Sequence, residues 1–297
     1  MRRIIPRNLI EHLEWKPGQE EPSLPPSLPE PQRDTSNYSV EDILRGQVFY
    51  DDKLPIALQQ ALDYATGEGI VATMPELIAA RVKTNKYHKF WKDWYTVLSE
   101  ENIGIDESGK PVLVTVHGGG ILMPKRINQA YEEGLINGSA KYIPEEFSDL
   151  LKGKLPDGNS IQLYSLDDLK RGISSLPRRY GVVMPYRMAQ ATQSGYFKKS
   201  EFVKNPVVIA RVGGLENLEA YHDKAKDSDG DVGNHHSFKG RDPSQAQGRL
   251  LFLSSIYDGL YRYYDLDNYG RFVGVSAGGA DIHTRSVRAR SGVTGAP

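Results

Sequence analysis

The chain has 297 residues, 39% of them apolar and 25% charged, which is enough for one large domain or two smaller ones. Its 37 lysines and arginines balance 38 aspartates and glutamates, so there is no global attraction to nucleic acid or anionic membrane. The absence of cysteine excludes disulfides, thiolate-bound metal and thiol nucleophiles. We find no signal peptide and no apolar run of the roughly 18–20 residues that span a bilayer, so we expect no membrane insertion and a cytoplasmic location, with the compartment otherwise unknown.

The first 38 residues differ in composition from the rest of the chain. Six prolines lie between residues 17 and 31, among glutamate, serine and glutamine. Such a stretch offers too little apolar surface for a core and too few N–H donors for a sheet. We therefore expect residues 1–38 to form an extended tail or linker.

Helical spacing dominates the stretch that follows. Ser39 precedes a run with acidic residues in its first turn, which is typical of a helix start. The expected elements are helices over residues 54–65, 74–83, 90–98, 127–135 and 145–151 and a strand over 111–116. We therefore expect residues 39–150 to be a mainly helical accessory region.

The second half of the chain mixes short strands and helices. The expected elements are strands over residues 182–184, 207–212, 249–253 and 271–275 and a helix over 215–226. Because these elements do not alternate regularly, they indicate the α+β class. We expect residues 155–275 to form a second domain and residues 276–297, rich in glycine, serine and arginine, a flexible tail.

Two glycine-rich motifs, each after an expected strand, are together typical of serine hydrolases. His117–Gly120 is similar to an oxyanion-hole loop, and Ser276 lies in a Gly-x-Ser-x-Gly sequence like that of a nucleophile elbow. That fold needs an acid and then a histidine well after the serine, whereas Asp281 and His283 lie almost against it. We favour two glycine-rich turns and keep as an alternative a serine hydrolase that uses Ser276 with the His117–Gly120 loop.

Three carboxylates at alternate positions, Asp227, Asp229 and Asp231, are similar to the opening of a calcium-binding loop. The EF-hand pattern requires glycine at its sixth position and glutamate at its twelfth, where this chain has Val232 and Phe238. A solvated loop is therefore the favoured interpretation, and Ca²⁺ is the only cofactor that the sequence leaves open.

Tyrosine is concentrated between Leu253 and Gly270. Five of the 17 tyrosines lie between residues 257 and 269, among serine, aspartate, asparagine and one arginine. The same residue types dominate antibody paratopes, because tyrosine offers a large contact area at low rotamer cost and short polar side chains adapt their hydrogen bonds. Clustered charges also favour display at the surface, since unpaired charges are rarely buried.

The residues of this segment also share a codon property. Serine, isoleucine, tyrosine, aspartate, arginine and asparagine are all reached by changing only the adenines of the asparagine codon AAC. Lysine, glutamate, glutamine, methionine and tryptophan cannot be reached in this way, and none occurs from Leu253 to Gly270. The expected fixed scaffold positions are Leu253, Gly259, Leu260, Leu266, Gly270, Arg271 and Phe272. The candidate ligand-binding residues are Ser254, Ser255, Ile256, Tyr257, Asp258, Tyr261, Arg262, Tyr263, Tyr264, Asp265, Asp267, Asn268 and Tyr269.

In these features the segment resembles the variable region of target-recognition proteins that retroelements diversify by mutagenesis at adenine. In that family the variable region lies near the C-terminus, as here, between unvaried flanks, to which Gln247–Leu253 and Gly270–Val275 are similar in position. The resemblance implies an irregular α+β domain of the C-type lectin type, related to the formylglycine-generating enzymes, with the varied side chains on an exposed ligand-binding face. It also implies a binding protein rather than an enzyme, with an unknown protein or cell-surface ligand as partner. A calcium-stabilised carbohydrate-binding domain is a further alternative, because lectin-type scaffolds accommodate sugars.

Overall fold

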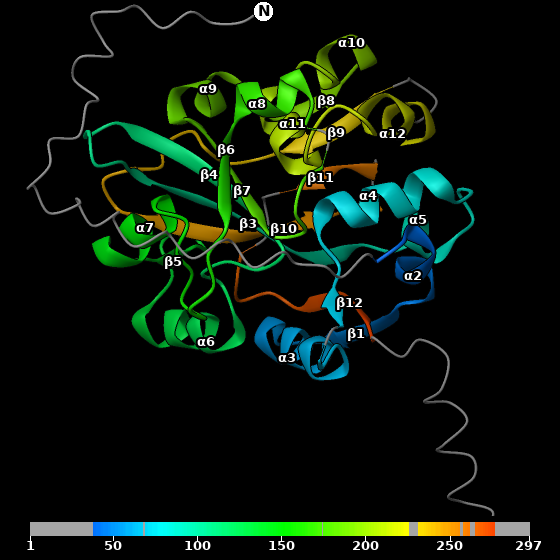
Figure 1. The fold of residues 1–297 in the computed structure, drawn as a ribbon, viewed down its shortest axis with the longest axis horizontal. Helices are drawn as coiled ribbons and strands as arrows, with labels where there is room; N and C mark the ends of the chain where they lie inside the picture. The colour runs from blue at the N-terminus through cyan, green and yellow to red at the C-terminus, as the bar shows by residue number, and fades with distance from the viewer. Residues whose placement is uncertain are drawn as a thin grey trace, which may run out of the picture. The chain divides into compact units, whose positions relative to one another are not determined.

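In the described part of the chain, a large mixed sheet lies between helices on its two faces (Figure 1). The computed structural model describes residues 38–67, 69–173, 175–225, 231–255, 258–261 and 265–276. Helices and strands follow one another without regular alternation, so the α+β class expected from the sequence is confirmed. The expected tails lie outside the described residues, apart from Tyr38 and Ser276 at their inner edges.

The strands of the large sheet come from both halves of the chain. They are β3 (Tyr95–Ile105), β4 (Pro111–His117), β5 (Ala140–Lys141), β6 (Gln162–Ser165), β7 (Tyr180–Pro185), β8 (Gly195–Phe197), β9 (Val232–His235), β10 (Gln247–Leu253) and β11 (Leu260–Tyr261). Their order among the described residues is β6-β7-β4-β3-β10-β11-β9-β8, with β5 also paired to β10. Pairing is antiparallel except between β6 and β7 and between β9 and β11.

A small sheet joins the first and last strands of the described chain. It consists of β1 (Gln47–Asp51), β2 (Ile70–Val71) and β12 (Gly270–Val275), with β12 in the middle. Together with the pairing of β3 and β10, this arrangement unites residues from both sides of position 150. The expected division into an accessory region 39–150 and a separate domain 155–275 is therefore not found, and the described residues belong to one compact unit.

Helices cover both faces of the large sheet. They are α2 (Val40–Arg45), α3 (Leu54–Tyr64), α4 (Met74–Lys83), α5 (Lys89–Lys92), α6 (Pro124–Glu133), α7 (Pro144–Leu151), α8 (Leu166–Arg171), α9 (Tyr186–Ala191), α10 (Lys199–Phe202), α11 (Pro206–Val212) and α12 (Leu218–Ala225). Ser39 caps α2 as expected, in a reciprocal capping box with Asp42. None of the described helices is long and apolar enough to cross a membrane.

Two hydrophobic cores follow from this layering, one on each face of the sheet. Along β10, Leu251 packs into the core that α4, α8, α9, α11 and α12 cover, whereas its neighbour Leu250 packs into the core under α3, α6 and α7. Successive side chains of a strand point to opposite faces. Both faces of the central strands are therefore buried.

Two expected elements have a different conformation. Residues 207–212, expected as a strand because of their β-branched content, form helix α11. Asn205 caps this helix by accepting two backbone N–H groups, Pro206 occupies its first turn and Gly213 ends it with a φ of +80°. Residues 95–98, expected as helix, belong to β3, which is buried on both faces and so lacks the alternation of a half-exposed strand.

Candidate functional site

The candidate segment runs from the end of β10 through β11 to the start of β12. Between the first two strands, the Ser254 N–H donates to the Gly259 carbonyl at 2.9 Å, and Asp258 has a φ of +46°. Further on, the Leu266 N–H donates to the Gly138 carbonyl at 3.0 Å. Neither bond depends on side-chain identity; the first closes the turn within the segment, and the second fastens the segment to the scaffold.

Burial differs between the two classes of position in this segment. The expected scaffold residues Leu253, Leu260, Leu266 and Phe272 are at most 1% exposed. Among the candidate ligand-binding residues, Asp265, Asp267 and Tyr269 are exposed and Ser255, Asp258, Tyr261 and Asn268 are half-buried. Ser254 departs from the expected exposed face, because it is only 5% exposed. The candidate residues Ile256, Tyr257, Arg262, Tyr263 and Tyr264 lie outside the described residues.

A fully buried ion pair lies beneath β11. Arg211 of α11 and Glu101 of β3 are both 0% exposed and make two contacts, of 2.8 and 2.9 Å. The same guanidinium donates to the Leu260 carbonyl at 3.1 Å and to the Asn234 side chain at 2.7 Å. Such bidentate, charge-assisted contacts fix geometry strongly. This pair therefore positions the strand that carries Tyr261.

Asp258 is held by residues that the sequence did not indicate. Its carboxylate forms an ion pair with Lys86, and its carbonyl accepts a hydrogen bond of 2.6 Å from the Tyr221 hydroxyl. Burial raises the pKa of Tyr221 to about 12, so this phenol remains a donor. Lys86 also lies 4.2 Å from the ring centroid of Trp91, which stacks on Tyr221. The turn before β11 thus rests on a fixed aromatic and cationic support.

Tyr261 stacks on a second residue outside the candidate segment. Its ring centroid lies 4.6 Å from that of His235, with the planes at 15°. The half-exposed Tyr196 meets the same imidazole edge-on at 5.1 Å. Desolvation, followed by the nearby Arg211 charge, lowers the pKa of His235, so the stacking partner is a neutral ring. Tyr261 is therefore preoriented rather than free to rotate.

Tyr269 has a similar fixed support. Its ring lies 4.8 Å from that of Trp94 and 6.3 Å from that of Tyr50, which is 49% exposed. Arg271 lies over both of these rings, 5.0 Å from Trp94 and 5.5 Å from Tyr50, and pairs with Asp93 at 2.8 Å. Tryptophan, tyrosine and arginine are the residue types enriched at binding hot spots. Trp94 and Tyr50 were missed as neighbours because they lie far from Tyr269 in the sequence.

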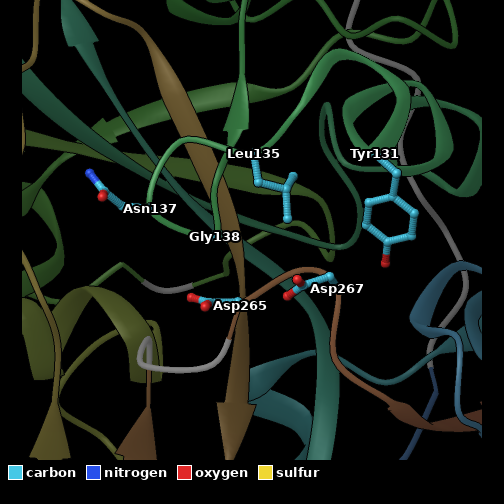
Figure 2. A pocket seen from close by; sticks show the side chains of 6 residues that line it. All are labelled: Tyr131, Leu135, Asn137, Gly138, Asp265 and Asp267. Carbon is cyan, nitrogen blue, oxygen red and sulfur yellow. The ribbon is translucent and has the colours of Figure 1, made fainter.

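A pocket of about 510 Å³ opens beside the end of the segment. Figure 2 shows Asp265 and Asp267 on one side of it, with the turn from Leu135 to Gly138 and the ring of Tyr131 on the other. The Tyr131 hydroxyl donates to the Leu266 carbonyl, and burial raises the pKa of this phenol to about 12. The candidate face therefore includes a concave region as well as stacked rings.

The histidine of the hydrolase alternative is part of the interior. His117 is 0% exposed; its Nδ1 lies 2.9 Å from Ser99 Oγ and its Nε2 lies 2.9 Å from the Ala210 carbonyl. Burial lowers the pKa of His117 to about 4, which keeps the ring neutral. Both ring nitrogens have protein partners, so His117 has no free nitrogen for a substrate.

The glycine-rich loop after His117 also has a structural role. The backbone N–H groups of Ile121 and Leu122 donate to the buried Glu100 carboxylate at 2.9 and 2.8 Å. A Cβ at Gly120 would lie 2.3 Å from Glu100 Oε1, which explains the glycine there. Within the motif, the Gly118 and Gly119 N–H groups donate to the Leu98 carbonyl at 2.9 and 3.3 Å, so they are already used within the protein. This arrangement gives the serine hydrolase alternative no support.

The calcium interpretation falls largely outside the described residues. Asp227 and Asp229 are not among them, and Asp231 immediately precedes β9. Within the part of the chain that the structure describes, no group of three or more histidines, aspartates and glutamates is arranged to hold a metal ion. The calcium site, and the carbohydrate-binding alternative that depends on it, remain predictions.

Comparison with known proteins gives one informative match. No protein-family model matches the chain, and no curated protein matches it in sequence. A solved structure, described as "Accommodation of massive sequence variation in Nanoarchaeota by the C-type lectin fold", is similar, with 29% identity and a TM-score of 0.62. The match covers 77% of this chain and 97% of that one. The α+β architecture described above is therefore that of the C-type lectin fold, as the resemblance of the candidate segment implied.

Proposed function

We propose that this protein is a target-recognition protein that displays a diversified ligand-binding face, formed by the varied positions of residues 253–270, on a fixed scaffold. The observation that carries the proposal is that burial separates most of the described positions expected to vary from those expected to form the scaffold. Asp265 and Asp267, expected to vary, are exposed, whereas Leu266 between them, an expected scaffold position, is 1% exposed. Ser254 is the exception, at 5% exposed.

The similar solved structure supports this proposal. Its description concerns massive sequence variation accommodated by the C-type lectin fold, and this chain has the same fold. Variation of this kind requires a scaffold whose stability does not depend on the varied side chains. Most substitutions at exposed positions change stability by only about 0.5 kcal/mol, which allows many sequences on one fold.

The way the segment is fastened also supports the proposal. Leu260 is held through its carbonyl by Arg211, and Leu266 through its N–H by Gly138 and its carbonyl by Tyr131. These contacts use backbone atoms or scaffold side chains. Side chains at the neighbouring positions can therefore change while the path of the backbone is kept. The partner that we propose is an unknown protein or cell-surface ligand.

A pair of matched libraries tests the proposal. In the first, the codons of Ser255, Asp267, Asn268 and Tyr269 are randomised at their first two bases, with C as the third base. In the second, the same randomisation is applied to the four buried polar residues at 99–102. We expect most members of the first library, and few of the second, to remain resistant to protease on the cell surface. Equal loss of folded members in both libraries would contradict the proposal.

Binding and origin need separate tests. The first library should yield binders to an immobilised test protein such as lysozyme, whereas a library of equal size at exposed positions of helix α8, such as Asp167, Lys170 and Arg171, should not. The proposed retroelement origin predicts a near-copy of the coding stretch for residues 249–275, different only at adenines, beside a reverse-transcriptase gene. Absence of both from the genome would refute that origin. The display function would then still be tested by the two libraries.

A further inference from the structure

Two buried arginines lie close together near Asp265, one of the residues that line the pocket. Arg249 of β10 is 2% exposed and Arg241 is 8% exposed. Both donate to one oxygen, Ser139 Oγ, at 2.7 Å from Arg249 Nε and 2.9 Å from Arg241 Nη1. Sharing this acceptor brings two positive charges into contact with the same atom. Burial, and then the charge of Arg241, lowers the pKa of Arg249 to about 10.

Asp265 supplies a carboxylate to this cationic pair. Its Oδ1 lies 3.2 Å from Arg249 Nη2, and its side chain is 51% exposed, so the carboxylate joins the buried cation to the pocket. The described side-chain partners of Arg241, besides Ser139, are the neutral Gln247 and Ser237. The charge of Asp265 is therefore important for both arginines.

Gly138 shapes the place where this carboxylate lies. A Cβ at position 138 would lie 1.9 Å from Asp265 Oδ1, and Gly138 has a φ of +71°, which also disfavours any other residue. Figure 2 shows Asp265 directly beside this glycine. A space bounded by bare backbone on one side and the Arg249 guanidinium on the other thus holds one carboxyl group. We call this space the carboxylate cradle.

Asp265 differs from the other exposed varied positions, because it is bound to a charged residue of the scaffold. Loss of the Asp265 charge would reduce the compensation of the buried Arg249 charge, to which Asp267 also contributes, and would favour binding of an anion that can reach the guanidinium. The bidentate geometry of a guanidinium also suits a planar carboxylate. Removal of the Asp265 side chain would expose the Arg249 guanidinium and the space beside Gly138 to the pocket.

We propose that residue 265 determines the charge of the ligand group that this pocket accepts. With aspartate, the protein's own carboxylate fills the cradle and the pocket excludes acidic groups. With alanine or serine, both reachable from the same codon, the cradle binds a carboxylate of the ligand, as on an aspartate or glutamate side chain. This inference rests on the proposed function, because it treats position 265 as one that varies.

Chemical rescue by acetate tests the inference on the full chain. We expect Asp265→Ala to melt below the parent protein, and sodium acetate to raise its melting temperature saturably relative to sodium chloride. The expected rise is roughly 3–6 °C at about ten times the acetate dissociation constant. Asp265→Ser provides the same test if the alanine variant does not fold. Inorganic phosphate, compared in parallel, shows whether the cradle prefers a planar carboxylate.

Two further variants locate the effect. Asp267→Ala removes the neighbouring exposed carboxylate and should respond to acetate no more than the parent protein does. Adding Gly138→Ala to Asp265→Ala should abolish the response, because the new methyl group would occupy the cradle. The same response in the parent protein, in Asp267→Ala or in the double variant would overturn the inference. Failure of acetate rescue together with success of the library test would refute the cradle and leave the proposed function intact.

Discussion

Two short polar segments of this chain have similar composition and opposite surroundings. Residues 99–102, Ser-Glu-Glu-Asn in β3, are at most 1% exposed. Residues 265–269, Asp-Leu-Asp-Asn-Tyr before β12, place two carboxylates and a phenol at the surface. In the first segment, Glu101 pairs with Arg211 and Glu100 accepts backbone N–H groups. Buried polar residues whose hydrogen bonds are all made within the protein therefore specify a single interior arrangement. Polar residues that face solvent form a surface that can adapt to different partners.

The two segments are physically connected. β3, which carries the first, pairs directly with β10, from which the candidate segment continues. Arg211 links Glu101 of β3 to the Leu260 carbonyl of β11. These interior polar groups thus hold the backbone from which the candidate segment extends. The tests below separate what each segment contributes, in order of decreasing effect on stability.

The largest effect is expected from Glu101→Gln. The substitution keeps the size of the side chain but leaves the Arg211 charge buried without its carboxylate, which typically costs about 3–5 kcal/mol of unfolding free energy. Denaturant unfolding measures this loss. Glu107→Gln, at an exposed ion pair with Lys152, is the matched control and should change stability by no more than about 0.5 kcal/mol. Similar losses in the two variants would show that the buried pair is not an anchor.

The next effect compares adjacent positions within the candidate segment. Leu266→Ala removes a fully packed side chain and should cost about 2–5 kcal/mol, whereas Asp267→Ala should change stability by about 0.5 kcal/mol or less. Thermal and denaturant unfolding of both variants provide the comparison. A greater loss for Asp267→Ala than for Leu266→Ala would reverse the assignment of scaffold and display positions.

A pH dependence of about 3 kcal/mol is expected from His117. Its pKa is 6.5 in the unfolded chain and about 4 in the folded one, so between these values the unfolded state binds a proton that the folded state does not. Stability therefore falls as the pH is lowered from 6.5 to 4, by about 3 kcal/mol in total. His117→Asn should remove this contribution. If stability fell by the same amount between pH 6.5 and 4 in the parent protein and in the variant, His117 would be excluded as the source of the pH dependence.

The smallest effect on stability is expected at Tyr269. Its ring is 38% exposed and packs on Trp94, so Tyr269→Ala should cost only about 1 kcal/mol. Tyr87→Ala, at a tyrosine that is 82% exposed, should cost less and serves as the control. In a selected binder, Tyr269→Ala should weaken binding more than it lowers stability. Severe unfolding of this variant would indicate that Tyr269 is a core residue.

Part of the fold could be predicted from the sequence. The tyrosine-rich segment with its codon property led to the C-type lectin type, and Ser39 gave the correct start of α2. The buried strand β3 could not be recognised, because Glu100 and Glu101 are polar and their partners lie far along the chain. Residues 207–212 show a further limit, since capping outweighed β-branched propensity there.

The candidate site was less predictable than the fold. Of the thirteen candidate residues, Asp265, Asp267 and Tyr269 are exposed in the described part of the chain. Nothing near the tyrosines in sequence indicated Trp94, on which Tyr269 packs, or His235, on which Tyr261 stacks. The cradle depends on Gly138 and Arg249, which come together only through the pairing of distant elements. Such contacts are properties of the tertiary structure, and local sequence patterns carry no record of them.

The central place of β12 in the small sheet has a consequence for folding. Its partners β1 and β2 come from the beginning of the described chain, so Gln47 must find Gly274 across nearly the whole domain. Contacts of such long sequence separation form slowly, and a chain made from its N-terminus exposes the edges of β1 and β2 until β12 has been synthesised. β12 immediately follows the candidate segment. In any variant, the substituted residues are therefore synthesised before β12 can pair with β1 and β2. Substitutions that hinder this pairing would leave the edges of β1 and β2 exposed to cellular proteases.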